Sequence, residues 1–252
     1  MSETYEIHLP AGADLEQSEE LFKVTLGGER RQLRIHDYEE VFSHPGLYEQ
    51  LLIDELHCSS PYVLASVLTT LVRSDGEDPA GLVVLDVGAG TGLLGEELAE
   101  RGVRSLVGVD IIPEAADAAR RDRPGLYEDY LVVDMADLPH DERRRLTERN
   151  FNCFTVVAAL SFDEVPPRAF AQAWNLVEDR AWIAFNIKQE VLADDSEGIG
   201  ALVGRMIDEG VLDRRARIHY RHRLSVRGDP LYYIALIGRK TADLPLDWIA
   251  EP

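Results

Sequence analysis

Five short and almost wholly apolar runs recur through the middle of the chain, and each is separated from the next by a stretch with helical spacing. The runs cover residues 82–87, 105–110, 130–134, 153–160 and 181–187. A strand buried on both faces is apolar along its length, and a parallel neighbour is reached only through a long crossover, usually a helix. The pattern therefore predicts an α/β fold with a mostly parallel sheet covered by helices on both faces.

Two longer strands are predicted near the carboxyl end, over residues 215–226 and 231–239. The connection between them, Arg227-Gly228-Asp229-Pro230, is so short that only an antiparallel pair can use it. The predicted sheet therefore has seven strands in a Rossmann-like arrangement and ends in an antiparallel hairpin. The first of these two strands alternates basic residues, Arg223 among them, with apolar ones, and we expect the basic face to pair with the chain's own carboxylates.

The first part of the chain predicts a smaller β structure. Residues 20–35 contain two β-prone runs around Gly27-Gly28, and glycine accepts the positive φ of the tight turns that join hairpin strands. Residues 5–9 predict a third strand. We therefore expect an amino-terminal hairpin ahead of the main sheet.

Apolar residues between positions 36 and 72 recur at helical spacing, with a break at Ser59-Ser60-Pro61. This pattern predicts two helices, the second capped by Ser60 and carrying Pro61 at its first position. Residues 1–75 are thus expected to form the hairpin and a helical cap, and residues 76–252 the sheet domain, in one continuous globular unit.

The chain is strongly acidic, with 46 Asp and Glu against 26 Lys and Arg among its 252 residues. Nucleic-acid phosphates are bound through Lys and Arg, so no nucleic-acid partner is expected. No run approaches the roughly 20 apolar residues of a membrane helix, and the start, MSETYEIHLP, lacks a secretory signal; we expect a cytoplasmic protein without a membrane partner. Cys58 and Cys153 lie far apart, which predicts no disulfide framework and no metal site.

The first apolar run leads directly into a glycine-rich turn, in the segment VVLDVGAGTG over residues 83–92. Glycine exposes bare backbone and accepts unusual dihedral angles, so a ligand can approach the main chain where the strand ends. The next two runs end at Asp110 and Asp134. Because the carboxyl ends of parallel strands meet at one edge, these residues predict a ligand across that edge, with Asp110 placed to accept from ribose hydroxyls.

Four segments resemble, in order and spacing, the first four motifs of class I S-adenosylmethionine-dependent methyltransferases: VVLDVGAGTG, VGVDIIPEAADAA, YLVVDMADLP and TVVAALSFDEVP. The resemblance covers about residues 82–240 in element order and is sharpest over 83–138. It implies a methyltransferase with S-adenosylmethionine as its cofactor. Phe154 departs from the family, which often has an acidic residue early in the fourth strand.

The resemblance also assigns site residues by position. Around the methionine part of the cofactor it implies a loop made of Asp86, Gly88, Ala89, Gly90 and Gly92. Around the nucleoside it implies that Asp110 binds the ribose, Ile111 packs on the adenine, Asp134 accepts from the adenine amino group and Met135 covers the ring. The end of the fourth strand, from Ala158 to Ser161, would lie near the methyl group.

The segment SFDEVPP follows the fourth strand, where related enzymes place groups that face the acceptor. Asp163 is the first candidate for a catalytic base and Glu164 the second, although an acid at this place also caps the next helix. Tyr38 and Tyr48 lie in a lead segment similar to that of small-molecule members, where such residues border the donor pocket; packing under a lid is the alternative. The absence of an Asp/Asn-Pro-Pro-aromatic sequence favours a small-molecule acceptor.

Two other functions stay open. The loop also contains Gly90, Gly92 and Gly95 in the spacing Gly-x-Gly-x-x-Gly, which is typical of an NAD(P)-dependent reductase. Against this, Gly88 begins the turn two residues earlier, and the chain after Asp110 is short for a second nucleotide-binding half and a substrate domain. The other alternative is a protein that binds S-adenosylmethionine without catalysis.

Overall fold

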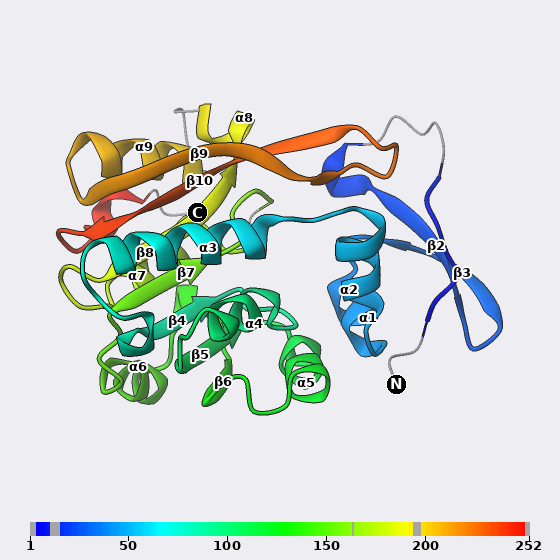
Figure 1. Cartoon of the computed structure of the whole chain (residues 1–252), viewed down its shortest axis with the longest axis horizontal. Coiled ribbons are helices and arrows are strands. Elements are labelled where there is room, and N and C mark those ends of the chain that lie inside the picture. Colours follow the sequence, from blue (N-terminus) through cyan, green and yellow to red (C-terminus); the bar gives the residue numbers. More distant parts are fainter. Residues whose placement is uncertain (1–3, 11–15, 163, 194–197, 250–252) are drawn as a thin grey trace.

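The central sheet contains seven strands in the order β6-β5-β4-β7-β8-β10-β9 (Figure 1). The computed structural model describes residues 4–10, 16–162, 164–193 and 198–249. The strands are β4 (Val83–Val87), β5 (Ser105–Asp110), β6 (Asp129–Val132), β7 (Cys153–Val156), β8 (Trp182–Lys188), β9 (Leu212–Leu224) and β10 (Pro230–Lys240). β4 to β8 pair in parallel, whereas β10 pairs antiparallel with β8 and with β9. The predicted sheet and its carboxyl-terminal hairpin are confirmed.

Helices cover both faces of this sheet, because its parallel strands are apolar on both sides. Val84 of β4 packs with α3 and α4, whereas its neighbour Leu85 packs with α6, α7 and α9 on the opposite face. The longer helices are α3 (Ser60–Ser74), α4 (Leu93–Glu100), α5 (Pro113–Asp122), α6 (His140–Thr147), α7 (Pro167–Trp174) and α9 (Gly198–Asp208). The shorter ones are η3 (Pro79–Gly81), η4 (Met135–Asp137), α8 (Gln189–Ala193) and η5 (Leu246–Trp248).

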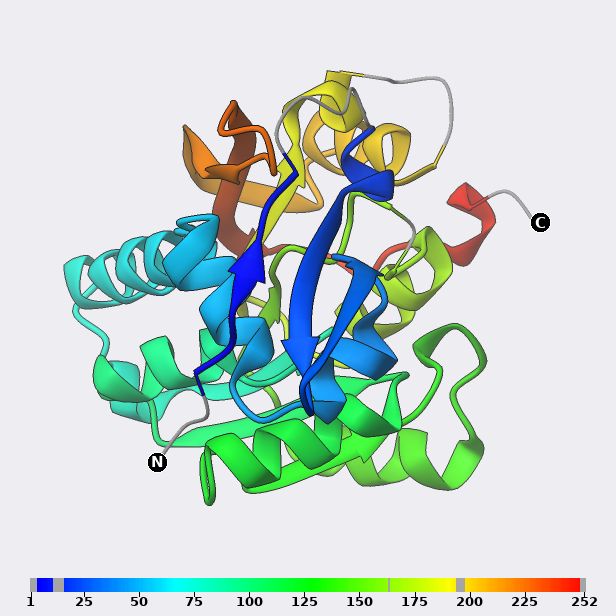
Figure 2. The same cartoon turned by 90° about the vertical axis from the view of Figure 1, so that its right-hand side faces the viewer.

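The amino-terminal strands form a separate small sheet at one end of the molecule, to the right in Figure 1 and towards the viewer in Figure 2. Its strands are β1 (Ile7–His8), β2 (Leu21–Leu26) and β3 (Glu29–Arg34), and neighbouring strands are antiparallel. A short 3₁₀ helix, η1 (Gln17–Glu19), lies between β1 and β2 in the chain. Gly27 and Gly28 join β2 to β3 with φ of 57° and 87°. The predicted hairpin and third strand are confirmed, although the third strand is short.

The helical cap lies between this small sheet and the central one (Figure 1). It consists of α1 (Tyr38–Ser43), α2 (Leu47–Glu49) and a π-helical turn, η2 (Gln50–Glu55). The first predicted helix is therefore broken, because Gly46 before α2 has a left-handed φ of 75°. The cap packs against β2 through Phe22, Val41 and Leu51. α3 packs on the central sheet instead, and the domain boundary at residue 75 stays a prediction.

Ser60 does not cap α3 as predicted. Its Oγ lies 2.6 Å from His222 Nδ1 and 2.7 Å from the Tyr220 hydroxyl, so the side chain is used in contacts with β9. Ser59 holds the cap position, without a side-chain hydrogen bond to the helix. Pro61 remains within the first two positions of the helix, as expected.

Arg223 does not lie on an exposed basic face. An irregularity in the β9–β10 pairing breaks the alternation between Arg221 and Arg223, which turns Arg223 inward. There it forms an ion pair of 2.5 Å with Glu20, and both side chains are almost completely buried. Arg215 forms an ion pair with Asp75 at 2.8 Å. Arg215 and Arg223 thus both pair with carboxylates of the chain itself, as expected.

Two predicted strands end early. β7 stops at Val156, two residues before Ala158, whose φ of 60° cannot continue a strand. β6 stops at Val132, so Asp134 lies beyond the strand and caps η4 by accepting from the Ala136 amide. In the part of the chain that is described, no helix combines the length and apolar character that crossing a membrane requires.

Candidate active site

The glycine loop after β4 is fastened to the neighbouring strand by its main chain. The amides of Gly88 and Ala89 both donate to the Val109 carbonyl, at 2.9 and 3.1 Å. Gly90 has φ of 54°, and a Cβ added there would point at the Phe42 ring, 3.7 Å from its Cζ. The loop therefore needs glycine for its backbone conformation, and it presents bare backbone towards the cap.

Asp110, at the end of β5, is locked to this loop. Its Oδ2 accepts from the Gly90 amide at 2.9 Å, and its Oδ1 accepts from the Ile112 amide at 3.0 Å. Burial raises the pKa of this carboxyl, and the amide donors oppose that rise. A carboxylate has about four acceptor sites, so acceptor capacity remains for a ligand hydroxyl.

Asp86 lies below the loop, and its carboxylate already has two protein partners. The Tyr127 hydroxyl donates to Oδ2 and the Thr155 hydroxyl to Oδ1, each at 2.8 Å. The side chain is 1% exposed, and burial raises its pKa to about 6. Its carboxylate thus ties β4 to β7 and to the segment before β6.

A cavity of about 350 Å³ lies at the carboxyl ends of these strands. Its volume is in the range of about 300–1,000 Å³ that small-molecule sites commonly have. The predicted site residues that line it are Tyr38, Tyr48, Gly88, Gly90, Asp110, Ile111, Asp134, Met135, Ala158 and Glu164. The structure thus brings most of the predicted residues together, from the loop, two strand ends, the cap and the segment after β7.

A smaller cavity of about 60 Å³ adjoins the glycine loop. It is lined by Asp86 and Ala89, and it shares Tyr48, Gly90 and Ala158 with the larger cavity. The two cavities therefore meet where the cap lies against the loop. Tyr48 stands at that junction.

Two predicted residues among those described line neither cavity, Gly92 and Ser161. Gly92 packs beneath the loop, where an added Cβ would lie 3.1 Å from Leu126 and Tyr127. Ser161 accepts from the Lys188 amide through Oγ at 3.1 Å, and it does not line either cavity. Asp163 lies outside the described residues.

The nucleoside residues differ in exposure. Ile111 is 58% exposed at the rim, whereas Met135 is 4% exposed and forms part of the core. Asp134 is exposed, and its Oδ1 already accepts from the Ala136 amide at 2.7 Å. A flat apolar ligand at this edge of the sheet would cover Ile111 and lie beside the carboxylate of Asp134.

Two tyrosines and a phenylalanine were not predicted from the sequence. The Tyr130 hydroxyl donates to the Gly90 carbonyl at 2.8 Å, and Tyr127 holds Asp86 from below. Phe42 lines the larger cavity opposite the loop. Their signal in the sequence was weak, because aromatic residues in or beside a strand or helix usually indicate core packing alone.

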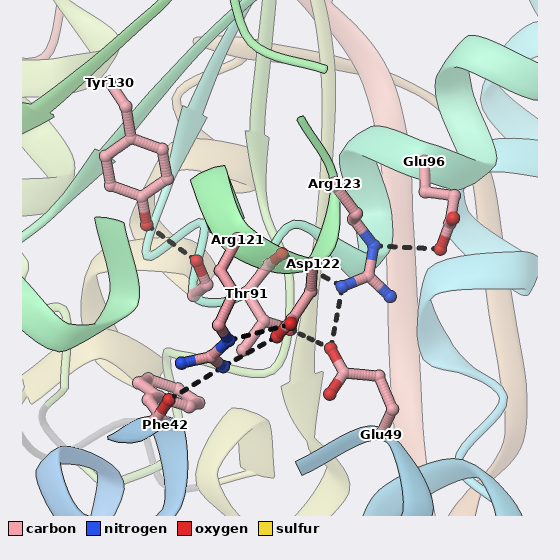
Figure 3. Close-up of polar contacts among 9 residues, drawn as sticks. Phe42, Glu49, Thr91, Glu96, Arg121, Asp122, Arg123 and Tyr130 are labelled. Carbon is pink, nitrogen blue, oxygen red and sulfur yellow. Dashed lines mark hydrogen bonds and ion pairs between the residues drawn. The ribbon is translucent and has the colours of Figure 1, made fainter. Parts of the chain in front are cut away.

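One ion pair and two hydrogen bonds connect the cap to the sheet domain, as Figure 3 shows. Glu49 Oε1 accepts from the Thr91 hydroxyl and from Arg123 Nη1, both at 2.7 Å, and Arg123 also donates to Glu96 at 2.9 Å. From the last turn of α5, Arg121 donates to the Phe42 carbonyl at 3.0 Å. The cap is thus docked directly beside the glycine loop.

The lining of the two cavities carries acidic groups but no basic side chain among the described residues. The charged residues there are Asp86, Asp110, Asp134 and Glu164. Such a lining favours a ligand that is positively charged or neutral over an anion.

A family model described as a methyltransferase domain matches residues 84–179. The ribosomal protein L11 methyltransferase of Aeromonas hydrophila is 38% identical over 69 residues, which cover 27% of this chain and 24% of that protein. The ubiquinone biosynthesis O-methyltransferase of Xanthomonas axonopodis pv. citri is 36% identical over 89 residues, or 34% of each protein. The chain thus spans only about a quarter to a third of these curated relatives.

Solved structures resemble a larger part of the chain. The N-methyltransferase NodS from Bradyrhizobium japonicum, in complex with S-adenosyl-L-homocysteine, superposes with a TM-score of 0.56 at 14% identity, over 82% of this chain and 98% of NodS. Protein 1320 of Thermoplasma acidophilum gives a TM-score of 0.51 at 16% identity, over 82% and 97%. At such identities the likeness concerns the fold alone, and it agrees with the predicted fold class.

Proposed function

Residues 84–179 form a class I S-adenosylmethionine-dependent methyltransferase domain, and from this premise we propose that the protein transfers a methyl group from S-adenosylmethionine to a small-molecule acceptor. The observation that carries the proposal is the larger cavity. It joins Asp110 and the glycine loop on one side to Tyr38 and Glu164 on the other. Donor and acceptor can therefore meet in one cavity.

The residues at the strand ends fit this cofactor. In the proposal, the remaining acceptor capacity of Asp110 binds the ribose hydroxyls, and Ile111 and Met135 enclose the adenine with Asp134 at its amino group. The bare backbone from Gly88 to Gly90 lies along the methionine part. The acidic lining suits the positive charge of the sulfonium.

S-adenosylmethionine supplies an electrophilic methyl group on a positively charged sulfur. The protein then has to hold the acceptor in line with that methyl, exclude water and accept a proton. Tyr38, Phe42 and Tyr48 form the wall that excludes water, and Glu164 is the carboxylate on the acceptor side. We assign Glu164 the role of proton acceptor, with Asp163 outside the described residues.

The reductase alternative loses support from the sheet topology. A dinucleotide fold has two parallel nucleotide-binding halves, whereas here β10 lies between β8 and β9 and runs antiparallel to both. Glycine at position 95 is also required by packing, because an added Cβ there would lie 2.7 Å from the Tyr127 hydroxyl. The Gly-x-Gly-x-x-Gly spacing is therefore accounted for by packing within the domain.

The proposal is tested first by thermal unfolding with saturating S-adenosylmethionine, S-adenosylhomocysteine or NADH. A ligand at about 100 times its Kd adds about 2.7 kcal/mol, so the first two should raise Tm by about 5 °C or more. NADH should leave Tm unchanged. Stabilisation by NADH alone would overturn the cofactor assignment.

The acceptor part is tested by following S-adenosylhomocysteine formation with a panel of small molecules and, separately, with ribosomal protein L11. Turnover of at least one small molecule is expected. Methylation of the protein substrate without turnover of any small molecule would overturn the small-molecule assignment. Cofactor binding with no product from any acceptor would favour the non-catalytic alternative.

A further inference from the structure

We propose that the acceptor is an amine, held between the three aromatic rings of the cap and the carboxylate of Glu164. This inference rests on the proposed methyl transfer and names the chemical class of its acceptor. It depends on the shape of the aromatic wall, on the placement of Glu164 and on the charges of the lining.

Tyr38, Phe42 and Tyr48 form an aromatic wall on the cap side of the cavity. Tyr38 and Phe42 stack with ring centroids 5.4 Å apart, at 23° between their planes. Tyr48 meets Phe42 edge-to-face, at 4.9 Å and 81°. All three rings line the cavity, and together they offer ring faces and edges in two orientations. Such a surface attracts a cationic or partly charged nitrogen through the ring quadrupoles.

The two tyrosines stay neutral. Burial raises the pKa of Tyr38 well above its ordinary value, and burial likewise raises that of Tyr48. Neither hydroxyl is therefore ionised at physiological pH. The rings act as apolar faces and hydrogen-bonding phenols, and they leave Glu164 as the charged group beside this wall.

Glu164 is oriented by two donors. The Tyr38 hydroxyl lies 3.4 Å from Oε1, and the Phe162 amide donates to Oε2 at 3.0 Å. The carboxylate lines the cavity together with Tyr38, and its charge raises the pKa of Tyr38 and Tyr48 further. An amine beside the rings would therefore reach an acceptor oxygen of Glu164 at the same time.

An anionic acceptor has no counter-charge in the described lining. Arg223 acts electrostatically on Tyr38 and Tyr48, but it is paired with Glu20 at 2.5 Å and lines neither cavity. Lys188 also lines neither cavity, and its Nζ lies over the Phe162 ring at 5.9 Å. His36 packs against Phe162 and Tyr38 outside the cavity, and burial lowers its pKa. A carboxylate or phosphate would face Glu164 without compensation, which costs binding free energy.

Methyl transfer from a sulfonium to an amine nitrogen can proceed with the groups in this site. An ammonium beside the sulfonium is disfavoured by like-charge repulsion, which lowers the amine's pKa in the site. The proton passes to Glu164 and from there to water, which frees the nitrogen lone pair. That pair forms the new N–C bond as the S–C bond breaks, and the electron pair of the broken bond stays on sulfur. The positive charge moves from sulfur to the methylated nitrogen, so the charges balance.

The test uses the full chain saturated with S-adenosylhomocysteine, so that no turnover occurs. Two matched sets are titrated by calorimetry: benzylamine, benzyl alcohol and benzoate; and cyclohexylamine, cyclohexanol and cyclohexanecarboxylate. Each amine should bind at least tenfold more tightly than its alcohol, and neither carboxylate should bind. Tighter binding of an alcohol or carboxylate, or no discrimination within either set, overturns the proposal.

Glu164→Gln keeps the side-chain shape and removes the charge. We expect the amine preference over the alcohol to fall at least tenfold, while the affinity for S-adenosylhomocysteine changes less than twofold. Glu100→Gln, an exposed position at the end of α4, is the matched control and should change neither quantity. An unchanged amine preference in Glu164→Gln overturns the proposal.

Tyr38→Leu tests the rings separately, with its Tm recorded to show that the variant is folded. It should weaken amine binding about fivefold and alcohol binding less. If S-adenosylhomocysteine fails to bind the native chain, the proposed function itself fails and this inference fails with it. If S-adenosylhomocysteine binds and the amines show no preference, only the acceptor class is wrong.

Discussion

On the donor side of the cavity the glycine loop is held by main-chain hydrogen bonds to the adjacent strand, whereas on the acceptor side the wall is assembled from distant segments. Gly88 and Ala89 donate to Val109, about 20 residues further along the chain. Tyr38 and Glu164, by contrast, are 126 positions apart. The donor side is therefore built within one β-α-β unit, and the acceptor side depends on how the cap docks.

This difference predicts different responses to substitution. A donor-side group that binds the cofactor directly should change affinity strongly and leave the rest of the fold in place. A group that docks the cap should change stability and acceptor binding more than cofactor affinity.

The largest effect is expected from Asp110→Ala. The variant removes the carboxylate that we assign to the ribose and that also holds Gly90. Loss of a charge-assisted pair of hydrogen bonds should weaken S-adenosylmethionine binding about a hundredfold, measured by calorimetry. Asp208→Ala, at an exposed position in α9, is the control and should bind normally. Unchanged affinity in Asp110→Ala would contradict the ribose assignment.

The second effect concerns pH and the buried carboxyl of Asp86. Its pKa is raised to about 6 by burial, from an ordinary value of 3.8. The folded protein thus holds this proton more tightly than the unfolded chain, so the stabilisation is fully present below pH 3.8 and is lost as the pH rises through 6. Between about pH 4 and pH 7 the loss should be about 2 kcal/mol.

Urea unfolding at a series of pH values measures this loss, with Asp86→Asn as the comparison. The difference between the native chain and the variant should change by about 2 kcal/mol across that range. The carboxyl carbon resonance of Asp86 gives the pKa directly in the folded protein. A midpoint below pH 4 would show that burial does not perturb this group.

The fold could be predicted from the sequence wherever a single pattern decided the local structure. The β5 strand has the predicted bounds, and the hairpin follows from Gly27-Gly28. Ser60 was mispredicted because capping residues and buried hydroxyls look alike in a sequence. Arg223 was mispredicted because the irregularity in the β9–β10 pairing has no local signal, and its partner Glu20 lies 203 residues away.

Part of the cavity lining could also be predicted from the sequence. Gly90, Asp110 and Asp134 follow strand ends, and parallel pairing alone brings them to one edge. Phe42 and Glu49 belong to the cap, whose position depends on Arg121 and Arg123 of the α5 region. Tyr38, Tyr48 and Glu164 were named through the resemblance, but no spacing in the sequence records how the cap docks, so the contacts of Phe42 and Glu49 needed the three-dimensional structure.

A smaller effect is expected when the cap is loosened by Glu49→Gln. The variant removes the charge that faces Arg123, while the amide oxygen still accepts from Thr91. The free energy of unfolding should fall by about 1.5 kcal/mol, the low end for a hydrogen bond to a charged group. Acceptor KM should rise more than the Kd for S-adenosylmethionine. Glu55→Gln, exposed in the same region, is the control. A larger change in cofactor Kd than in acceptor KM would place Glu49 on the donor side.

The smallest effect is expected from Tyr130→Phe, which returns the comparison to the donor side. The variant removes one hydrogen bond of 2.8 Å, from the tyrosine hydroxyl to the Gly90 carbonyl, and leaves the packing in place. One neutral hydrogen bond contributes about 1 kcal/mol, so urea unfolding should show a loss of that size. Tyr232→Phe, at a 44% exposed ring, should show none. Because the Gly88, Ala89 and Gly90 amides still hold the loop, cofactor affinity should fall by about threefold at most. If Tyr130→Phe lowered cofactor affinity as much as Asp110→Ala, then Tyr130, rather than the main-chain hydrogen bonds to β5, would hold the loop in place.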